Sequence, residues 1–363
     1  MLTGSEIVIA ACGAGVFGCF AGSFLNVVAH RLPRNLSIAH PPSRCGACGT
    51  QLAWHDNLPL IGWLALRGRC RHCGGAIAPR YVLMELLCGA LTAATVAFAL
   101  LVPQAPAPWI ADPLIATALA ATALLIAVYA CVVAMITDLE HQIIPDEISL
   151  PLIVAAPALS VAAGTGLPES SVWLSWLDPH QPARSLAWIA AGAGAVGVAL
   201  ILLLMALSVR VHAGFETWQP AERRAYRIGS LFAAGSVAAG FALAALLPAE
   251  HLLVSALLLY GMLGFAVGWL LILLVTVVGS AVARTSAMGF GDAKLFAPLC
   301  ALLGPEGALI AFALACGVGV LLSLPKLLLG GDSRIPFGPS LIIGWALTIV
   351  FGPWLHARLP WQP

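Results

Sequence analysis

Charged residues are scarce in this sequence. They make up only 9% of its 363 residues, whereas hydrophobic residues make up 61%. A soluble domain carries about 25% charged residues, because its surface must face water. The composition therefore excludes an ordinary soluble globular protein and predicts a polytopic membrane protein of the all-α class.

Apolar runs of about 20 residues, the length at which an α-helix crosses a bilayer, recur along the chain. We expect about ten transmembrane helices, and the eighth run is short enough for a tilted or half-inserted helix. The expected spans are residues 7–28, 82–102, 114–136, 147–164, 185–209, 230–248, 253–282, 292–304, 306–325 and 340–356.

Positive charge is absent before the first apolar run, where the sequence reads "MLTGSE", whereas "HRLPR" follows that run. A cleaved signal peptide has the opposite order, so we expect this run to remain as a membrane helix with its N-terminus outside. Ten spans then place 15 of the 17 basic residues in inside loops and leave Arg184 and Arg358 outside. Because basic residues gather on the inside of membrane proteins, this distribution favours ten crossings.

Four of the ten cysteines lie in the longest segment between apolar runs, at about residues 30–80. They form two Cys-x2-Cys pairs, "CGAC" at 45–48 and "CRHC" at 70–73, separated by 21 residues. This spacing is typical of two turns that present four thiolates to a tetrahedral structural zinc ion. Two disulfides or free thiols are the alternatives, and disulfides are disfavoured in a reducing inside compartment. The predicted ligands are Cys45, Cys48, Cys70 and Cys73.

Two acidic residues stand at the inner ends of apolar runs. Asp138 follows the run "AVYACVVAMIT", at a helix C-terminus, where the helix dipole disfavours an anion. Asp292 follows two glycines, and an uncharged run of 32 residues lies just upstream, at 252–283. A carboxylate at a membrane boundary is costly and marks a functional site by default. If one of the two stays protonated, the pair can activate water against an amide and protonate the leaving nitrogen. A helix N-cap at Asp292, or cation binding in a transporter, is the alternative.

Three charged neighbours of these aspartates have simpler expected roles. Asp146 precedes the helical run "EISLPLIVAA", so we expect a helix N-cap there, with Glu147 in the first turn. Lys294 either holds a carboxylate ionised or extends to the membrane boundary as a snorkelling residue, and we favour the second role.

Five motifs, in order, resemble those of bacterial type IV prepilin peptidases, which are integral-membrane aspartic proteases of the GxGD type. The tetrapeptide "GFGD" alone is a weak signal, but the five motifs together are spread over most of the chain. They are "GSFLNVVAHRLP" at 22–33, the cysteine-containing stretch at 43–87, "DLEHQIIPD" at 138–146, "GFGDAK" at 289–294 and "IPFGPSL" at 335–341.

The resemblance implies an activity and its residues. Members of this family remove the short basic leader of type IV prepilins and type II secretion pseudopilins, after a glycine, at the cytoplasmic face of the bacterial inner membrane. Many also N-methylate the new N-terminus with S-adenosylmethionine. Catalysis would rest on Asp138 and Asp292, and the leader would meet the acidic residues Glu140, Asp146 and Glu147. The expected partners are these substrates and membrane lipid, with no nucleic acid.

The residues that bind the methyl donor are not assigned by the sequence. It contains no glycine-rich nucleotide loop of the kind that follows a strand. The resemblance associates methylation only with the N-terminal inside segment.

The resemblance also implies a division of the chain. A first transmembrane helix at 1–29 precedes the cytoplasmic zinc segment at 30–81, and the aspartic peptidase domain follows at 82–363. The family core has eight helices, so the two helices expected within about 185–248 look like an inserted hairpin. A hairpin adds two crossings and keeps both aspartates on the inside face. It either shapes pilin docking or fills lipid-facing space.

Three other functions are compatible with parts of the sequence. A peptidase without methyltransferase activity would keep both aspartates. An ion-coupled transporter would use the same aspartates, but it does not account for the zinc segment. A membrane scaffold with a zinc-bound loop would leave the aspartates incidental.

Overall fold

The computed structural model describes residues 3–101, 112–164, 183–212, 220–247, 252–284, 288–328 and 336–356. Within these ranges the chain is largely helical, and extended pairing is limited to two isolated bridges. The all-α fold class is therefore confirmed. Arg358, expected outside, and Ile335, the first residue of "IPFGPSL", lie outside the described residues.

Each of the ten expected spans corresponds to one helix, nine of them long and one short. A short helix α2 (Ile61–Ala65) and two 3-10 turns, Leu32–Arg34 and Trp54–Asn57, lie in the cysteine-containing segment. The long helices are α1 (Gly4–Arg31), α3 (Arg80–Leu101), α4 (Pro113–His141), α5 (Asp146–Gly164), α7 (Ala183–His212), α8 (Pro220–Leu246), α9 (Leu252–Ala283), α11 (Gly304–Leu328) and α12 (Gly338–His356), and the short one is α10 (Phe290–Ala301).

Most of these helices have the length and composition of membrane spans. Within the part of the chain that the structure describes, seven of them, α1, α3, α4, α5, α8, α9 and α11, are long and apolar enough to cross a bilayer. Helices α7 and α12 contain shorter apolar stretches, at Gly194–Arg210 and Gly338–Gly352. Helix α10 has only 12 residues, as the short run near 292–304 indicates. The chain is thus a multi-pass membrane protein.

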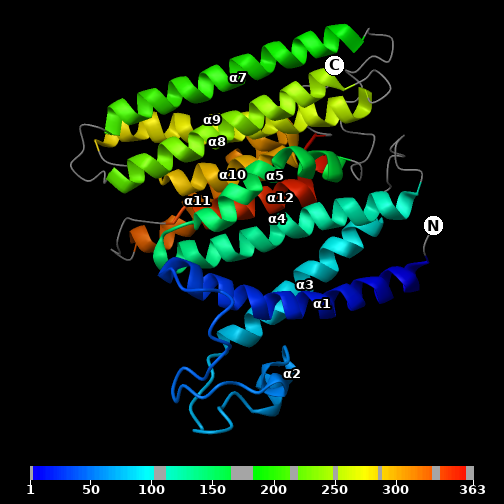
Figure 1. Ribbon diagram of the computed structural model, residues 1–363, viewed down its shortest axis with the longest axis vertical. Helices are drawn as coiled ribbons and strands as arrows, with labels where there is room; N and C mark the ends of the chain where they lie inside the picture. Colours follow the sequence, from blue (N-terminus) through cyan, green and yellow to red (C-terminus); the bar gives the residue numbers. More distant parts are fainter. Residues whose placement is uncertain are drawn as a thin grey trace.

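The long helices lie side by side in one bundle (Figure 1). Helices α1 and α3 pack together at one edge, next to the cysteine-containing segment, and α7 lies at the opposite edge beside α8 and α9. Helix α10 lies between these edges and contacts α5, α9, α11 and α12. This short helix is therefore enclosed by other helices.

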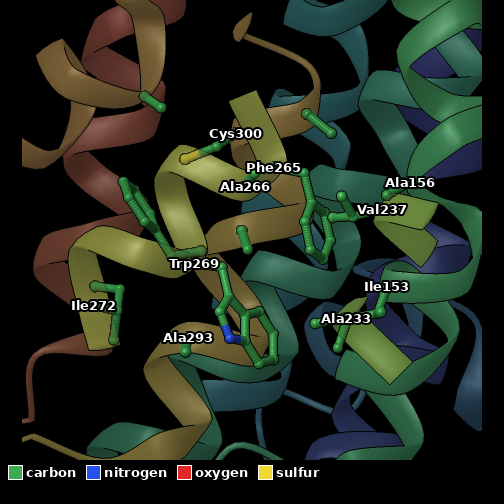
Figure 2. Close-up of a cluster of buried hydrophobic side chains, with 14 of the residues drawn as sticks. Ile153, Ala156, Ala233, Val237, Phe265, Ala266, Trp269, Ile272, Ala293 and Cys300 are labelled. Carbon is green, nitrogen blue, oxygen red and sulfur yellow. The ribbon is translucent and has the colours of Figure 1, made fainter. Parts of the chain in front are cut away.

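The largest buried cluster joins α5, α8, α9 and α10 (Figure 2). Phe265 and Trp269 of α9 are fully buried within it, beside Val237 of α8 and Ala293 of α10. In lipid, helices associate through close van der Waals packing rather than through the hydrophobic effect. This cluster therefore fixes the position of α10 against its neighbours.

Candidate active site and metal centre

The four predicted zinc ligands converge. The sulfur atoms of Cys45, Cys48, Cys70 and Cys73 all lie within 4.8 Å of one another, and Cys45 Sγ is 3.9 Å from Cys73 Sγ. Tetrahedral zinc with Zn–S bonds of about 2.3 Å places its sulfur ligands about 3.8 Å apart. The four cysteines are free, so this donor set fits a structural zinc ion.

Two turns of the same design present these sulfurs. In each turn the first cysteine donates its N–H to the carbonyl five residues later and accepts the N–H of the glycine four residues later. Both glycines have φ near +70°, a conformation that glycine adopts without strain. The bonds are Cys45 N to Thr50 O (2.9 Å), Gly49 N to Cys45 O (2.9 Å), Cys70 N to Gly75 O (2.8 Å) and Gly74 N to Cys70 O (2.9 Å).

At two of the four cysteines, Cys48 and Cys70, local hydrogen bonds favour the thiolate form that zinc requires. Cys48 Sγ and Thr50 Oγ1 are 3.3 Å apart, and the Thr50 hydroxyl lowers the pKa of the Cys48 thiol to about 6. Backbone N–H groups of Cys73 and His72 lower the pKa of the Cys70 thiol. Zinc binding releases a proton from each thiol, so these donors assist metal binding near neutral pH.

The cysteine-containing segment is also tied to the membrane helices. Glu85, buried on α3, accepts the backbone N–H of Leu60 at 2.8 Å. Within the segment, Arg71 of the second turn donates three hydrogen bonds to Asp56, the shortest of them 2.6 Å long. These bonds connect the second cysteine turn to the 3-10 turn Trp54–Asn57, and the start of α2 to α3.

Asp138 lies in the last turn of α4 and is only 7% exposed. Gln142, with φ of 54°, ends the helix and donates its N–H to the Asp138 carbonyl at 2.9 Å. The Asp138 side chain accepts, at Oδ2, the backbone N–H of Gly338 at 3.1 Å. Gly338 begins α12, and the first N–H groups of a helix have no partner within it. The N-terminus of α12 thus compensates for the unfavourable dipole of α4.

Sequence reasoning gave Gly338 no role. A Cβ atom at this position would lie 2.5 Å from Asp138 Oδ2, so a larger residue would displace the Asp138 carboxyl group. The available signal was the motif "IPFGPSL" itself, in which a glycine stands at a helix start beside an apolar run.

Asp292 is the third residue of α10 and is 7% exposed. The N-cap position is occupied by Gly289, so the alternative that Asp292 caps this helix is wrong. A carboxylate in the first turn is instead stabilised by the helix dipole. The Asp138 and Asp292 carboxyl groups interact electrostatically. Gly291, whose Cβ would lie 3.2 Å from Ile144 Cβ, packs against the turn between α4 and α5.

Lys294 is buried rather than snorkelling, with 5% of its surface exposed. Its ammonium group pairs with Asp146 and lies 5.3 Å from the centroid of the Phe290 ring. Asp146 lies in the first turn of α5 and not at the N-cap, because the carbonyl of Pro145 accepts the first helical N–H groups. The ion pair joins the first aspartate motif to the second.

Comparison with known proteins gives a consistent result. Residues 16–99 match the model of the Bacterial Peptidase A24 N-terminal domain. A protein of Myxococcus xanthus named prepilin leader peptidase/N-methyltransferase is 31% identical over 357 residues, which cover 95% of this chain and 91% of the relative. No solved structure matches at a comparable level.

Shorter relatives carry the same name. The Klebsiella pneumoniae protein is 34% identical over 199 residues, covering 52% of this chain and 80% of the relative. The Dichelobacter nodosus protein is 35% identical over 167 residues, covering 38% of this chain and 52% of the relative. With the near full-length match to the Myxococcus protein, these results show that the chain belongs to the prepilin leader peptidase/N-methyltransferase family.

Proposed function

We propose that this protein cleaves the leader peptide of type IV prepilins or type II secretion pseudopilins with Asp138 and Asp292, and N-methylates the new N-terminus. The observation that carries this proposal is that two carboxyl groups, each 7% exposed and each in the end turn of a helix, α4 or α10, interact electrostatically. The basic loops described above favour the cytoplasmic face of the membrane for this site.

The proposed cleavage is general acid–base catalysis. One carboxylate takes a proton from water, which attacks the scissile carbonyl, and the other carboxyl group protonates the leaving nitrogen. Asp138 Oδ2 already accepts a hydrogen bond from Gly338, so Asp138 suits the role of base and Asp292 that of acid. Gly289, whose Cβ position has only Asp292 Oδ2 within 4 Å, leaves room for the substrate backbone.

The acidic residues available to a basic leader are fewer than the sequence suggested. Glu140 forms an ion pair with Arg80, and Asp146 pairs with Lys294. Glu147 lies in the first turn of α5 and is exposed. We therefore assign the first contact of a leader lysine or arginine to Glu147.

The methyl donor proposed is S-adenosylmethionine. Asn26, in the region matched by the family model, has a buried Oδ1 that receives no hydrogen bond from the described residues, while its Nδ2 donates to Tyr81 O at 3.3 Å. This acceptor suits an amino group of the donor. The zinc ion would fold the adjoining segment, and zinc itself supplies no step of the reaction.

The test uses purified full-length protein in detergent, with a prepilin and S-adenosylmethionine, followed by intact-mass measurement. We expect a product that lacks the leader and carries one methyl group. Asp138→Asn and Asp292→Asn should each lower cleavage by about 10²- to 10⁴-fold, the contribution of a general acid or base. Full cleavage by either variant would refute the pair.

The same assay separates the other functions. A cleaved but unmethylated product would identify a peptidase without methyltransferase activity. Cleavage in detergent, where no ion gradient exists, excludes a role in transport alone.

A further inference from the structure

The hairpin of α7 and α8 reaches the "GFGD" motif. Tyr226, at 3% exposure on α8, has its ring centroid 4.2 Å from that of Phe290, the second residue of the motif. On the other side, the Trp269 ring of α9 lies 5.7 Å from Phe290 at an interplanar angle of 84°. The Phe290 ring is therefore held between two aromatic rings from different helices.

Gly229 also contacts Phe290, and we refer to Tyr226, Gly229 and Trp269 together as the seat of Phe290. A Cβ atom at Gly229 would lie 2.7 Å from Phe290 Cε1 and 3.2 Å from Lys294 Cδ, so any larger residue displaces one of these side chains. Gly235, further along α8, has nothing within 4 Å of its Cβ position. The two glycines of one helix thus differ sharply in what they contact.

Helical geometry links this seat to Asp292. Phe290 and Lys294 are four residues apart and share one face of α10, whereas Asp292 lies about 200° around the helix from Phe290, at about 100° per residue. Contacts on the first face therefore set the direction of the second face, toward Asp138. Gly289 and Gly291 restrict the backbone very little. The Phe290 side chain, between these two glycines in the sequence, therefore fixes the position of the first turn of α10.

We propose that Phe290, seated by Tyr226, Gly229 and Trp269, is a positioning residue for Asp292, and that the α7–α8 hairpin serves cleavage by forming this seat. The inference rests on the proposed role of Asp138 and Asp292. It assigns the hairpin a role other than pilin docking or the filling of lipid-facing space.

The experiment compares Gly229→Ala with Gly235→Ala in the full-length protein. We expect Gly229→Ala to lower kcat for prepilin cleavage on the order of 10- to 100-fold with KM nearly unchanged, since small misplacements of a reacting group cost this much. Gly235→Ala should retain the wild-type rate. Alanine favours a helix more than glycine does, so a weakened α8 cannot explain the loss. Equal rates for both variants would overturn the proposal.

A second substitution tests whether the clash with Phe290 is the cause. Phe290→Leu shortens the side chain, so adding it to Gly229→Ala should cost less than the product of the two single losses. Strictly multiplicative losses would overturn the proposal. The limbs of the pH–rate profile should also move closer together in Gly229→Ala, because the two carboxyl groups interact less when displaced. An unshifted profile with a reduced rate would count against positioning.

Asp292→Asn, measured alongside, separates the two levels of inference. If Asp292→Asn cleaves normally, the proposed function itself fails. If Asp292→Asn is inactive and Gly229→Ala is fully active, the aspartate pair stands and only the seat of Phe290 is refuted.

Discussion

The cysteine-containing segment and the aspartate site hold their functional groups in opposite ways. Two short turns present the cysteines, and each turn is closed by its own backbone hydrogen bonds. The aspartates come from α4 and α10, and their closest supports come from α5, α8, α9 and α12. A metal ion can organise the first site from local sequence, whereas the second exists only when helices far apart in sequence are packed. Damage to one site should therefore leave the other largely intact.

Loss of a zinc ligand is the strongest test of this independence. Cys45→Ser leaves three thiolates, and a segment this small depends on its metal to fold. We expect zinc content to fall to background and methylation to be lost, while prepilin cleavage falls by less than about tenfold, because α4 and α10 keep their packing. Zinc content by elemental analysis, with Cys316→Ser as the control, checks the first part. Loss of cleavage as complete as in Asp138→Asn would contradict independence.

Gly338→Ala tests the same independence by damaging the aspartate site instead of the cysteine site. The added Cβ would press on Asp138 Oδ2 and disturb the hydrogen bond from the helix start. We expect cleavage to fall about 10²-fold, as for other small displacements of a reacting group. Zinc content should not change. Gly317→Ala on α11, whose Cβ position is open, is the matched control. Wild-type cleavage by Gly338→Ala would mean that Asp138 needs no such support.

The Lys294–Asp146 pair should show an asymmetry. The Lys294 side chain is 6% exposed and that of Asp146 is 45% exposed. Asp146→Ala leaves a buried ammonium without a partner and should destabilise the protein by about 2–3 kcal/mol, below the cost for a fully buried pair. Lys294→Met leaves a carboxylate that water can reach and should cost less. Thermal unfolding in detergent measures both, and the reverse order would be inconsistent with this geometry.

Arg71→Ala should have the smallest effect. Arg71 lowers the pKa of Asp56 by hydrogen bonding, so their pairing stabilises the segment above the ordinary aspartate pKa of about 3.9 and is lost as the pH falls through the lower folded value. We expect the variant to release zinc to a chelator modestly faster than the wild type does. The ratio of the two release rates should be the same at pH 7 and at pH 5. Arg67→Ala is the control. If the two release rates become equal by pH 5, the loss of the Arg71–Asp56 pair is excluded as the cause of the faster release.

The sequence predicted most of the fold but only part of the site. Apolar runs located the helices because hydrophobic length is a local property, and the cysteine spacing located the four converging cysteines for the same reason. Asp138 and Asp292 were singled out by their cost at a membrane boundary. The contacts of Gly338 with Asp138, Lys294 with Asp146 and Tyr226 with Phe290 depend on how distant helices pack, so no local pattern identified which residues would be partners. Asp146 and Asp292 are not the N-caps considered for them, because Pro145 and Gly289 occupy the cap positions and each aspartate lies in the first turn of its helix.

The hydrogen bond from Gly338 to Asp138 has a consequence for synthesis of the protein. Asp138 is made early, whereas Gly338 begins the last described helix of the chain. A growing chain therefore carries both aspartates before it carries the donor that supports the first of them. The proposed aspartate pair therefore has this hydrogen bond only after α12 has been made and has packed against α4.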